Sequence, residues 1–327
     1  MAPVRTAAAV GGLFGLLLLS VIFARTDWTQ LLHAVSLTGG KLLWLAPYRL
    51  VFFGLYALGW MALLLPYNTG KEVGFAYVCW VTAVREAIDR LLPVASIGGG
   101  VVGVRLVHLR GVPTVAASAT VIVEVLLTLL ALYVFFALGV ALRIGSNGTN
   151  ESYSSLLIAL LLSLLVPLTM TLLLQQGTAF TRLEGLLRRM LGITMLSLEA
   201  ASLDHEIKAC LRRRSAISVS GTLQLAAMIS GSFEIWFVLR VLGHPIEIKS
   251  ALIMESLTQA VRHVAFVVPG GIGVQEAGLI AFGHAVGVGS DLALTVSFAK
   301  RIRELICGVP CLISWSLVEG GRLRSTG

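Results

Sequence analysis

The chain has 327 residues, enough for two soluble domains, but its composition excludes an ordinary soluble protein. Hydrophobic residues make up 57% and charged residues only 13%, with a mean hydropathy of +0.89, whereas a soluble domain is about 25% charged. The sequence therefore predicts an all-α, polytopic integral membrane protein, with residues 1–327 in a single transmembrane domain. The formal charge of +8 requires no nucleic-acid partner, because the loop charges described below account for it.

The first apolar run, residues 7–24, is flanked by Arg5 and Arg25. Its length is marginal for a membrane span, which needs about 20 residues, and a signal peptide is the competing interpretation. No Ala-x-Ala-like cleavage site follows the run, and further apolar segments do. We therefore expect an uncleaved first helix.

Longer apolar stretches follow and bring the expected number of transmembrane helices to about eight. They lie at 42–66, 73–92, 114–142, 154–175, 216–241, 250–268 and 291–318. Two Gly-rich pieces, at about 98–110 and 274–287, are too short to span comfortably. We expect them to be Pro/Gly-broken re-entrant segments, which persist at membrane depth only where protein or a cavity surrounds the backbone.

Two loops predict the orientation. Residues 143–153 contain one Arg and no Lys, whereas residues 178–214 contain seven basic residues. The positive-inside rule places the second loop in the cytoplasm and the first outside, with both termini cytoplasmic. The 178–214 connector has apolar residues at helical spacing, which predicts amphipathic helices on the inner membrane surface; a solvated connector is the alternative.

An internal repeat is indicated when the sequence is shifted by 176 positions. Helix, proline, Gly-rich break and charged helix recur in the same order in residues about 42–142 and about 216–318. The coinciding landmarks are Trp60 with Trp236, Pro93 with Pro269, and His108 with His284. Because the loop charges orient the two halves oppositely, we predict an inverted-topology repeat, an arrangement that recurs in transporters.

Ionisable residues within the apolar segments are candidates for a polar path. Polar stripes on one helix face precede each break, and the last helix carries four charges near its middle. Charges at membrane depth are costly and face a bundle interior or a cavity. Two interpretations stay open: a structural salt-bridge network, in which Lys300 and Glu304 pair at i, i+4, or a cavity that also meets a polar or anionic headgroup, with Glu124 or Glu234 as counter-charge.

The second break reads Pro269-Gly-Gly-Ile-Gly-Val-Gln-Glu276. Proline cannot continue a helix and glycine exposes backbone, so Glu276 is expected near the start of the next short helix. There it either caps the helix or serves the polar path. The first break matches G-x-G-x-x-G at residues 98–103, but no βαβ unit surrounds it, so we reject a dinucleotide site. We expect no cofactor, and the four cysteines predict neither a disulfide framework nor a metal site.

With the later segment Ala299-Lys-Arg-Ile-Arg-Glu-Leu305, this PGGIGVQE stretch resembles the lysylphosphatidylglycerol synthase transmembrane-region family of flippase-like proteins. Residues about 40–318 are similar, most closely to hopanoid-biosynthesis-associated members of the HpnL type. The resemblance implies a multi-pass protein of the bacterial inner membrane that moves hopanoid-type lipids toward the outer membrane. One departure is Gly100, where the family pattern has an acidic residue.

Three functions are compared. The first is a lipid transporter or flippase that binds a hopanoid or phospholipid; a homo-oligomer is possible. The second is a non-transporting membrane subunit of a lipid-synthesis complex. The third, a phospholipid-modifying enzyme, is least expected, because the longest hydrophilic stretch, 178–214, is too small for a catalytic domain.

The candidate path residues are the charged side chains and break residues named from these patterns. They are Arg85, Arg90, Arg105, Glu124, Glu234, Glu255, Arg262, Pro269, Gly270, Gly271, Gly273, Gln275, Glu276, Lys300, Arg301, Arg303 and Glu304. For a hopanoid we also expect apolar walls from Phe266, Val267, Leu279 and Phe282.

Overall fold

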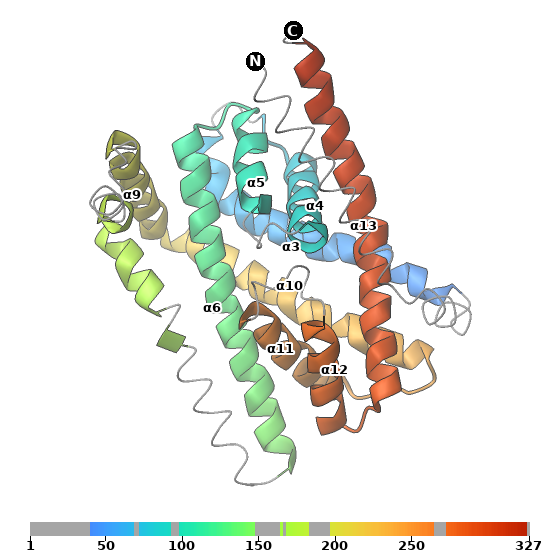
Figure 1. Cartoon of the computed structure of the whole chain (residues 1–327). Helices are drawn as coiled ribbons and strands as arrows, with labels where there is room; N and C mark the ends of the chain where they lie inside the picture. Colours follow the sequence, from blue (N-terminus) through green and yellow to red (C-terminus); the bar gives the residue numbers. More distant parts are fainter. Residues whose placement is uncertain are drawn as a thin grey trace.

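The computed structural model describes residues 40–68, 72–92, 98–147, 164–165, 168–182, 197–264 and 273–325. Within these ranges every regular element is a helix (Figure 1), so the predicted all-α class is confirmed. The predicted first helix at 7–24, and the stretches 93–97 and 265–272 at the two breaks, lie outside the described residues.

The first half of the described chain contains four main helices whose bounds lie close to the predicted ones. Short 3-10 turns, η1 (Lys41–Trp44) and η2 (Leu65–Tyr67), flank the first of them. The four are α3 (Leu45–Leu64), α4 (Phe75–Leu91), α5 (Gly98–His108) and α6 (Thr114–Asn147). Helix α6 is longer than expected and takes in the start of the predicted 143–153 loop.

The second half repeats this order after the connector. Residues 168–176 are helical and belong to the apolar stretch predicted at 154–175. The helices that follow are α9 (Ser197–Arg212), α10 (Arg214–Val241), α11 (Ile248–Val264), α12 (Val274–Ala285) and α13 (Ser290–Ser325). Helix α9 confirms a helix in the 178–214 connector, where its buried Asp204 accepts the backbone N–H groups of Phe180 and Thr181.

Among the described residues, three helical segments are long and apolar enough to cross a membrane. They are Lys41–Tyr67, Thr114–Ile144 and Arg214–Val241. Helices α4 and α11 have 17 residues each, which corresponds to about 25 Å and is shorter than a hydrocarbon core of about 30 Å. The count of about eight spans and the re-entrant character of the short segments stay predictions.

Helices α3 and α10 pack along each other through the middle of the molecule (Figure 1). Helices α4 and α5 lie on one side of this pair, and α11 and α12 lie on the other. Each half is completed by a helix of the other half, because α13 packs on α4 and α6 packs on α11. The four-helix order and its packing partners therefore recur between the halves, while their inverted orientation stays a prediction.

The helix boundaries at the two breaks follow from local chemistry. Leu92, at φ −107° and ψ 149°, is extended because the following proline disfavours a helical conformation. Across the first break, the Asp89 carboxylate accepts the Gly99 N–H at 2.9 Å and so caps the start of α5. At the second break Gly273 has φ +83°, and its N–H donates to Glu276 Oε2 at 2.7 Å, so both short helices begin on a carboxylate.

Glycines allow the closest helix contacts. A Cβ at Gly139 of α6 would overlap Ser256 Oγ of α11, and one at Gly308 of α13 would lie 2.6 Å from Leu91 Cδ1 of α4. Small residues at such crossings let helix backbones approach closely, as is common between membrane helices. These two crossings are the ones that join each half to the last helix of the other.

Candidate functional site

Nine charged side chains from six helices meet in the interior and form a connected set of ion pairs, called here the central network. Each member lies within 4 Å of at least one other member of opposite charge. The members are Arg49 (α3), Glu86 and Arg90 (α4), Glu234 (α10), Arg262 (α11), Glu276 (α12) and Arg301, Arg303 and Glu304 (α13).

The first part of the network joins α3 to α4. Arg49 Nη2 pairs with Glu86 Oε1, and Arg90 Nε lies 3.6 Å from the same oxygen. The Arg49 guanidinium also stacks over Phe52, 3.4 Å from the ring centroid, which is a favourable cation–π contact. Arg49 Nη1 lies 3.5 Å from Glu234 Oε1 of α10 and so links the two halves.

The second part is centred on α13. Arg303 Nη1 lies 2.6 Å from Glu234 Oε1, and Arg303 Nη2 lies 3.7 Å from Glu304 Oε1. The Glu304 carboxylate also receives Arg262 at 3.3 Å and Arg301 at 3.4 Å. Three arginines therefore surround one buried glutamate.

Glu276 both caps α12 and joins the central network. Its Oε2 accepts a hydrogen bond from the Gly273 N–H and caps α12. Its Oε1 accepts a hydrogen bond from Ser297 Oγ at 2.9 Å and lies 3.5 Å from Arg301 Nε. The neighbouring Gln275 accepts Arg262 Nη1 at 2.6 Å. The start of α12 is thus held against the network on two sides.

Two further buried pairs lie outside the network. Lys300 pairs with Glu255, so the predicted i, i+4 pair with Glu304 does not form. Arg85 Nη1 lies 2.7 Å from Glu124 Oε2. Of the two counter-charges considered for the last helix, Glu234 contacts Arg303, whereas Glu124 pairs with Arg85 of α4.

The remaining predicted residues are distributed as follows. Arg105 is exposed and pairs with Glu319 near the end of α13, away from the network. Pro269, Gly270 and Gly271 lie outside the described residues, as do Phe266 and Val267. Leu279 is buried in the apolar core. Phe282 packs against the buried apolar side chains where α6 meets α11.

Arg49 is not among the site residues predicted from the sequence, although it is 6% exposed and central to the network. The sequence contained a signal for Arg49, because an arginine within the apolar run 42–66 is as costly to place at membrane depth as the charged residues in the candidate set. Glu86 lies on the polar face of α4 and is likewise absent from the candidate set.

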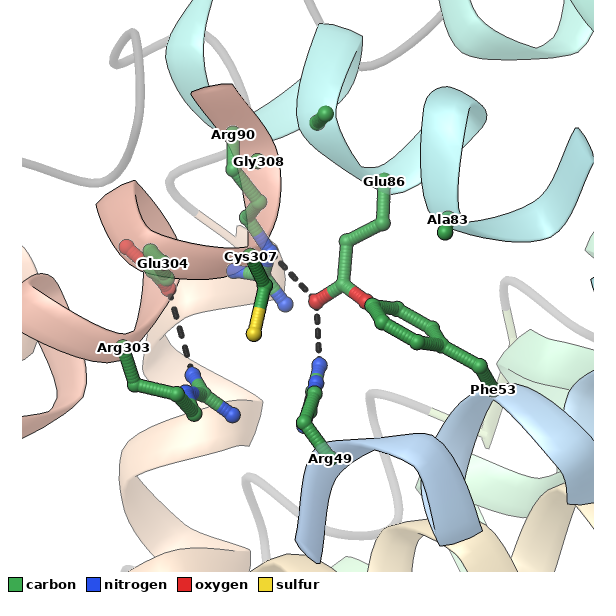
Figure 2. Close-up of a pocket in the computed structure, with 10 residues that line it drawn as sticks. Arg49, Phe53, Ala83, Glu86, Arg90, Arg303, Glu304, Cys307 and Gly308 are labelled. Atoms are coloured by element: carbon green, nitrogen blue, oxygen red, sulfur yellow. Dashed lines mark hydrogen bonds and ion pairs between the residues drawn. The ribbon is translucent and has the colours of Figure 1, made fainter. Parts of the chain in front are cut away.

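A small cavity opens where the two parts of the network face each other (Figure 2). Its volume is about 20 Å³, room for about one water molecule. Charged residues, Cys307 and four uncharged residues from α3, α4 and α13 line it: Arg49, Phe53, Ala83, Glu86, Ala87, Arg90, Arg303, Glu304, Cys307 and Gly308.

A larger apolar groove of about 480 Å³ lies at the start of α3 and the end of α10. Tyr48 and Phe233 line this groove, and each is followed directly by a network residue, Arg49 and Glu234 respectively. The complete lining is Trp44, Leu45, Pro47, Tyr48, Phe233, Trp236 and Phe237. Helix α3 therefore lines both the apolar groove and the charged cavity, through different residues.

The whole arrangement was compared with known proteins. No curated protein and no solved structure matches the chain. The family model described as "Lysylphosphatidylglycerol synthase TM region" matches residues 8–310 and so covers both halves, the central network and the PGGIGVQE break. The chain therefore belongs to the lysylphosphatidylglycerol synthase transmembrane-region family, a membrane-protein family linked to lipid metabolism.

Proposed function

We propose that this protein moves a lipid across the bacterial inner membrane and performs no chemical reaction on it. The central network carries the proposal: nine ionisable side chains are connected inside an apolar helical protein, and five of them line a cavity between two similar sets of helices. Such groups are costly at membrane depth and mark substrate pathways in many membrane proteins. Membership in a family linked to lipid metabolism supports a lipid as the substrate.

The two-part architecture supports transport in particular. Helices α3–α6 and α10–α13 repeat in order and in packing partners, and we propose that they are related by an axis in the membrane plane. Transporters with such inverted repeats place the substrate site at the repeat interface and expose it alternately on the two sides. A polar headgroup would pass the network while the apolar part of the lipid stays in the groove or the surrounding bilayer.

The narrower proposal is that the lipid is a hopanoid or a phospholipid. The sequence resemblance to hopanoid-associated family members supports the first. The charged lining of the cavity supports a phospholipid, since a hopanoid has only a modest polar end.

The second candidate is a non-transporting subunit of a lipid-synthesis complex. One observation favours it: the cavity has room for about one water molecule, so the network could serve only to hold the helices together. Buried salt bridges that fix an arrangement without adding stability are known.

The test measures movement of a fluorescent phospholipid between leaflets in liposomes that contain the purified chain. Arg301→Gln and Glu276→Gln are suitable variants, because their side chains are 20% and 25% exposed, and removing them should disturb folding less than removing the fully buried members. Arg105→Gln is the matched control outside the network. We expect both network variants to fold and to slow lipid movement, and the control to move lipid at the wild-type rate.

Wild-type protein that moves neither a phospholipid nor a hopanoid, but purifies together with lipid-synthesis enzymes, would favour the second candidate. Network variants that retain full transport would exclude this part of the central network as the path and leave only the fold assignment.

A further inference from the structure

The apolar groove between the start of α3 and the end of α10 is a large concavity that the central network does not line. Its volume of about 480 Å³ falls in the range of small-molecule pockets, about 300–1,000 Å³. Two of its large aromatic side chains are open to the surroundings, with Trp44 69% exposed and Phe233 45% exposed. The Tyr48 hydroxyl already donates a hydrogen bond to the Ser230 carbonyl at 2.8 Å. The groove therefore presents mainly apolar surface that nothing in the described part of the chain covers.

The position of the groove corresponds to a membrane boundary rather than to the bilayer centre. Trp44 lies at the start of α3 and Trp236 near the end of α10 (Figure 1), and tryptophan is enriched at membrane–water interfaces. Charged residues adjoin both: Lys41 precedes α3, and the Arg240 guanidinium stacks on the Trp236 ring at 5.1 Å. Since residues 178–214 are predicted to be cytoplasmic, α10 begins inside and ends outside. The groove is then at the outer boundary.

The chain that leads into α3 carries an apolar stripe with the spacing of a helix face. Residues 27–39, which lie outside the described residues, read Asp-Trp-Thr-Gln-Leu-Leu-His-Ala-Val-Ser-Leu-Thr-Gly. Apolar side chains recur at i, i+3, i+4 and i+7, with Thr, Gln and His between them: Trp28, Leu31, Leu32 and Val35. This pattern is typical of a short amphipathic helix that lies at a membrane surface with one face against apolar material.

The end of this stretch is fixed beside the groove. Gly40 has a φ of +80°, and its carbonyl accepts the Leu43 N–H at 3.0 Å in the turn that starts η1. A left-handed glycine commonly ends a helix and turns the chain away from its direction. The four residue steps from Leu37 to Lys41 span at most about 14 Å, and Trp44 follows one turn later. The stripe therefore cannot lie far from the groove.

The length of the stripe also suits the groove. The groove takes about one helical turn from each wall, Trp44 to Tyr48 on α3 and Phe233 to Phe237 on α10. Residues 28–35 form two turns, about 10 Å long, if helical. A segment of this length covers both walls and leaves its polar face to water.

We infer that residues 28–35 cover the apolar groove as an intramolecular strap, with the apolar stripe against the aromatic walls. The predicted topology agrees with this position. The first apolar run, 7–24, leads from the predicted cytoplasmic N-terminus to the outer side, and so brings residues 25–39 to the boundary where the groove opens. The inference goes beyond the proposed lipid movement and does not depend on it.

The strap braces the joint between the two halves. Tyr48 and Phe233 of the groove directly precede Arg49 and Glu234, the ion pair that links α3 to α10. A segment seated on both helices holds them together beside this pair. The apolar part of a transported lipid is then left to the surrounding bilayer.

The first experiment is cross-linking within the full-length chain in membranes, after replacement of its four cysteines. The pair Leu32→Cys and Phe233→Cys joins the apolar face of the strap to the groove, and a short bismaleimide should link the two within one chain. The matched control is Gln30→Cys with Phe233→Cys, because residues 30 and 32 fall on opposite helix faces at 100° per residue. Mass spectrometry of the peptides should show the link in the first pair and little of it in the control.

The second experiment measures how fast a maleimide labels Phe233→Cys. Leu32→Asp places a charge on the apolar face and should raise the labelling rate about tenfold or more, because losing the burial of one large apolar side chain shifts an opening equilibrium by at least that factor. Gln30→Asp adds the same charge to the polar face and should leave the rate unchanged. If Leu32→Asp prevents insertion of the chain, the cross-linking result decides alone.

Three results would overturn the inference. Equal linking of Leu32→Cys and Gln30→Cys would show that the stripe does not face the groove. Links that join two chains only would assign the groove to a second copy. No link within the chain, together with a labelling rate that Leu32→Asp does not change, would leave the groove open to membrane lipid.

Discussion

Glu234 is expected to be the most sensitive position of the central network. It is 2% exposed and accepts two arginines: Arg303 at 2.6 Å and Arg49 at 3.5 Å. Glu234→Gln preserves shape but removes the charge of the carboxylate that Arg303 and Arg49 share. Breaking a buried ion pair by removing one partner costs about 3–5 kcal/mol, and we expect the free energy of unfolding to fall by that amount.

Arg303→Met should cost less than Glu234→Gln, although it breaks the same pair. Methionine fills much of the arginine volume and carries no charge. Glu234 keeps Arg49, and Glu304 keeps Arg262 and Arg301. In the double variant the loss should be smaller than the sum of the two single losses. A coupling energy of about 1 kcal/mol or more separates this outcome from additive behaviour, which holds for independent sites within about 0.5 kcal/mol.

The assay is denaturation of the purified protein in detergent, followed by helical circular dichroism. The matched control is the exposed pair Arg105–Glu319, whose side chains are 59% and 22% exposed. Arg105→Met should cost about 0–1 kcal/mol, because exposed pairs contribute little. Additive losses at Glu234 and Arg303, or an Arg303→Met loss larger than that of Glu234→Gln, would contradict this account of the Glu234–Arg303 pair.

Three further predictions concern other parts of the chain. Gly139→Ala should destabilise the α6–α11 crossing by about 1–3 kcal/mol through overpacking, since the new methyl would overlap Ser256 Oγ. Denaturation should show that adding Ser256→Ala restores part of the lost stability. No loss of stability in the single variant would disprove the close approach of the two helices. Burial raises the pKa of the Cys210 thiol to about 11, so at pH 8 the thiol stays protonated and should resist maleimide until the protein is unfolded. Mass spectrometry of the labelled protein measures this resistance, and rapid labelling of Cys210 in the folded protein would contradict the prediction. Cysteines at Asn147 and Arg189 test the topology in a cysteine-free background: an impermeant reagent applied to intact cells should label the first only, and labelling of the second would reverse the predicted orientation.

The helices were predictable because hydropathy and proline/glycine breaks act locally. Helices α3, α4, α10 and α11 begin and end within a few residues of the apolar stretches, and the extended Leu92 follows from the proline after it. The family was also recognisable, because the PGGIGVQE stretch and the charged segment of α13 are specific short patterns.

The pairing of the charges could not be predicted in the same way. Spacing along one helix suggested Lys300 with Glu304, but the partners come from other helices, and Lys300 reaches Glu255 of α11. Which faces meet depends on tertiary packing, here on glycine crossings such as Gly308 against Leu91. Arg49 was overlooked for a related reason: a single charge in an apolar run gives no pattern, and its importance appears only when its partners are known.

Each half of the chain packs against the last helix of the other half, and this arrangement has a consequence for synthesis of the chain. Helix α4 ends at Leu91, yet its packing partner α13 begins at Ser290, and Trp80 donates a hydrogen bond to Ser314. At about 5–20 residues per second, the ribosome needs roughly 10–40 s to make the intervening chain. During that interval the first half is in the membrane with the face that α13 will cover still open, and its Arg90 has yet to meet the charges of α13. We therefore expect newly made chains to depend on an insertase or chaperone over this interval, and truncations before Ser290 to be degraded rather than accumulate as a stable half.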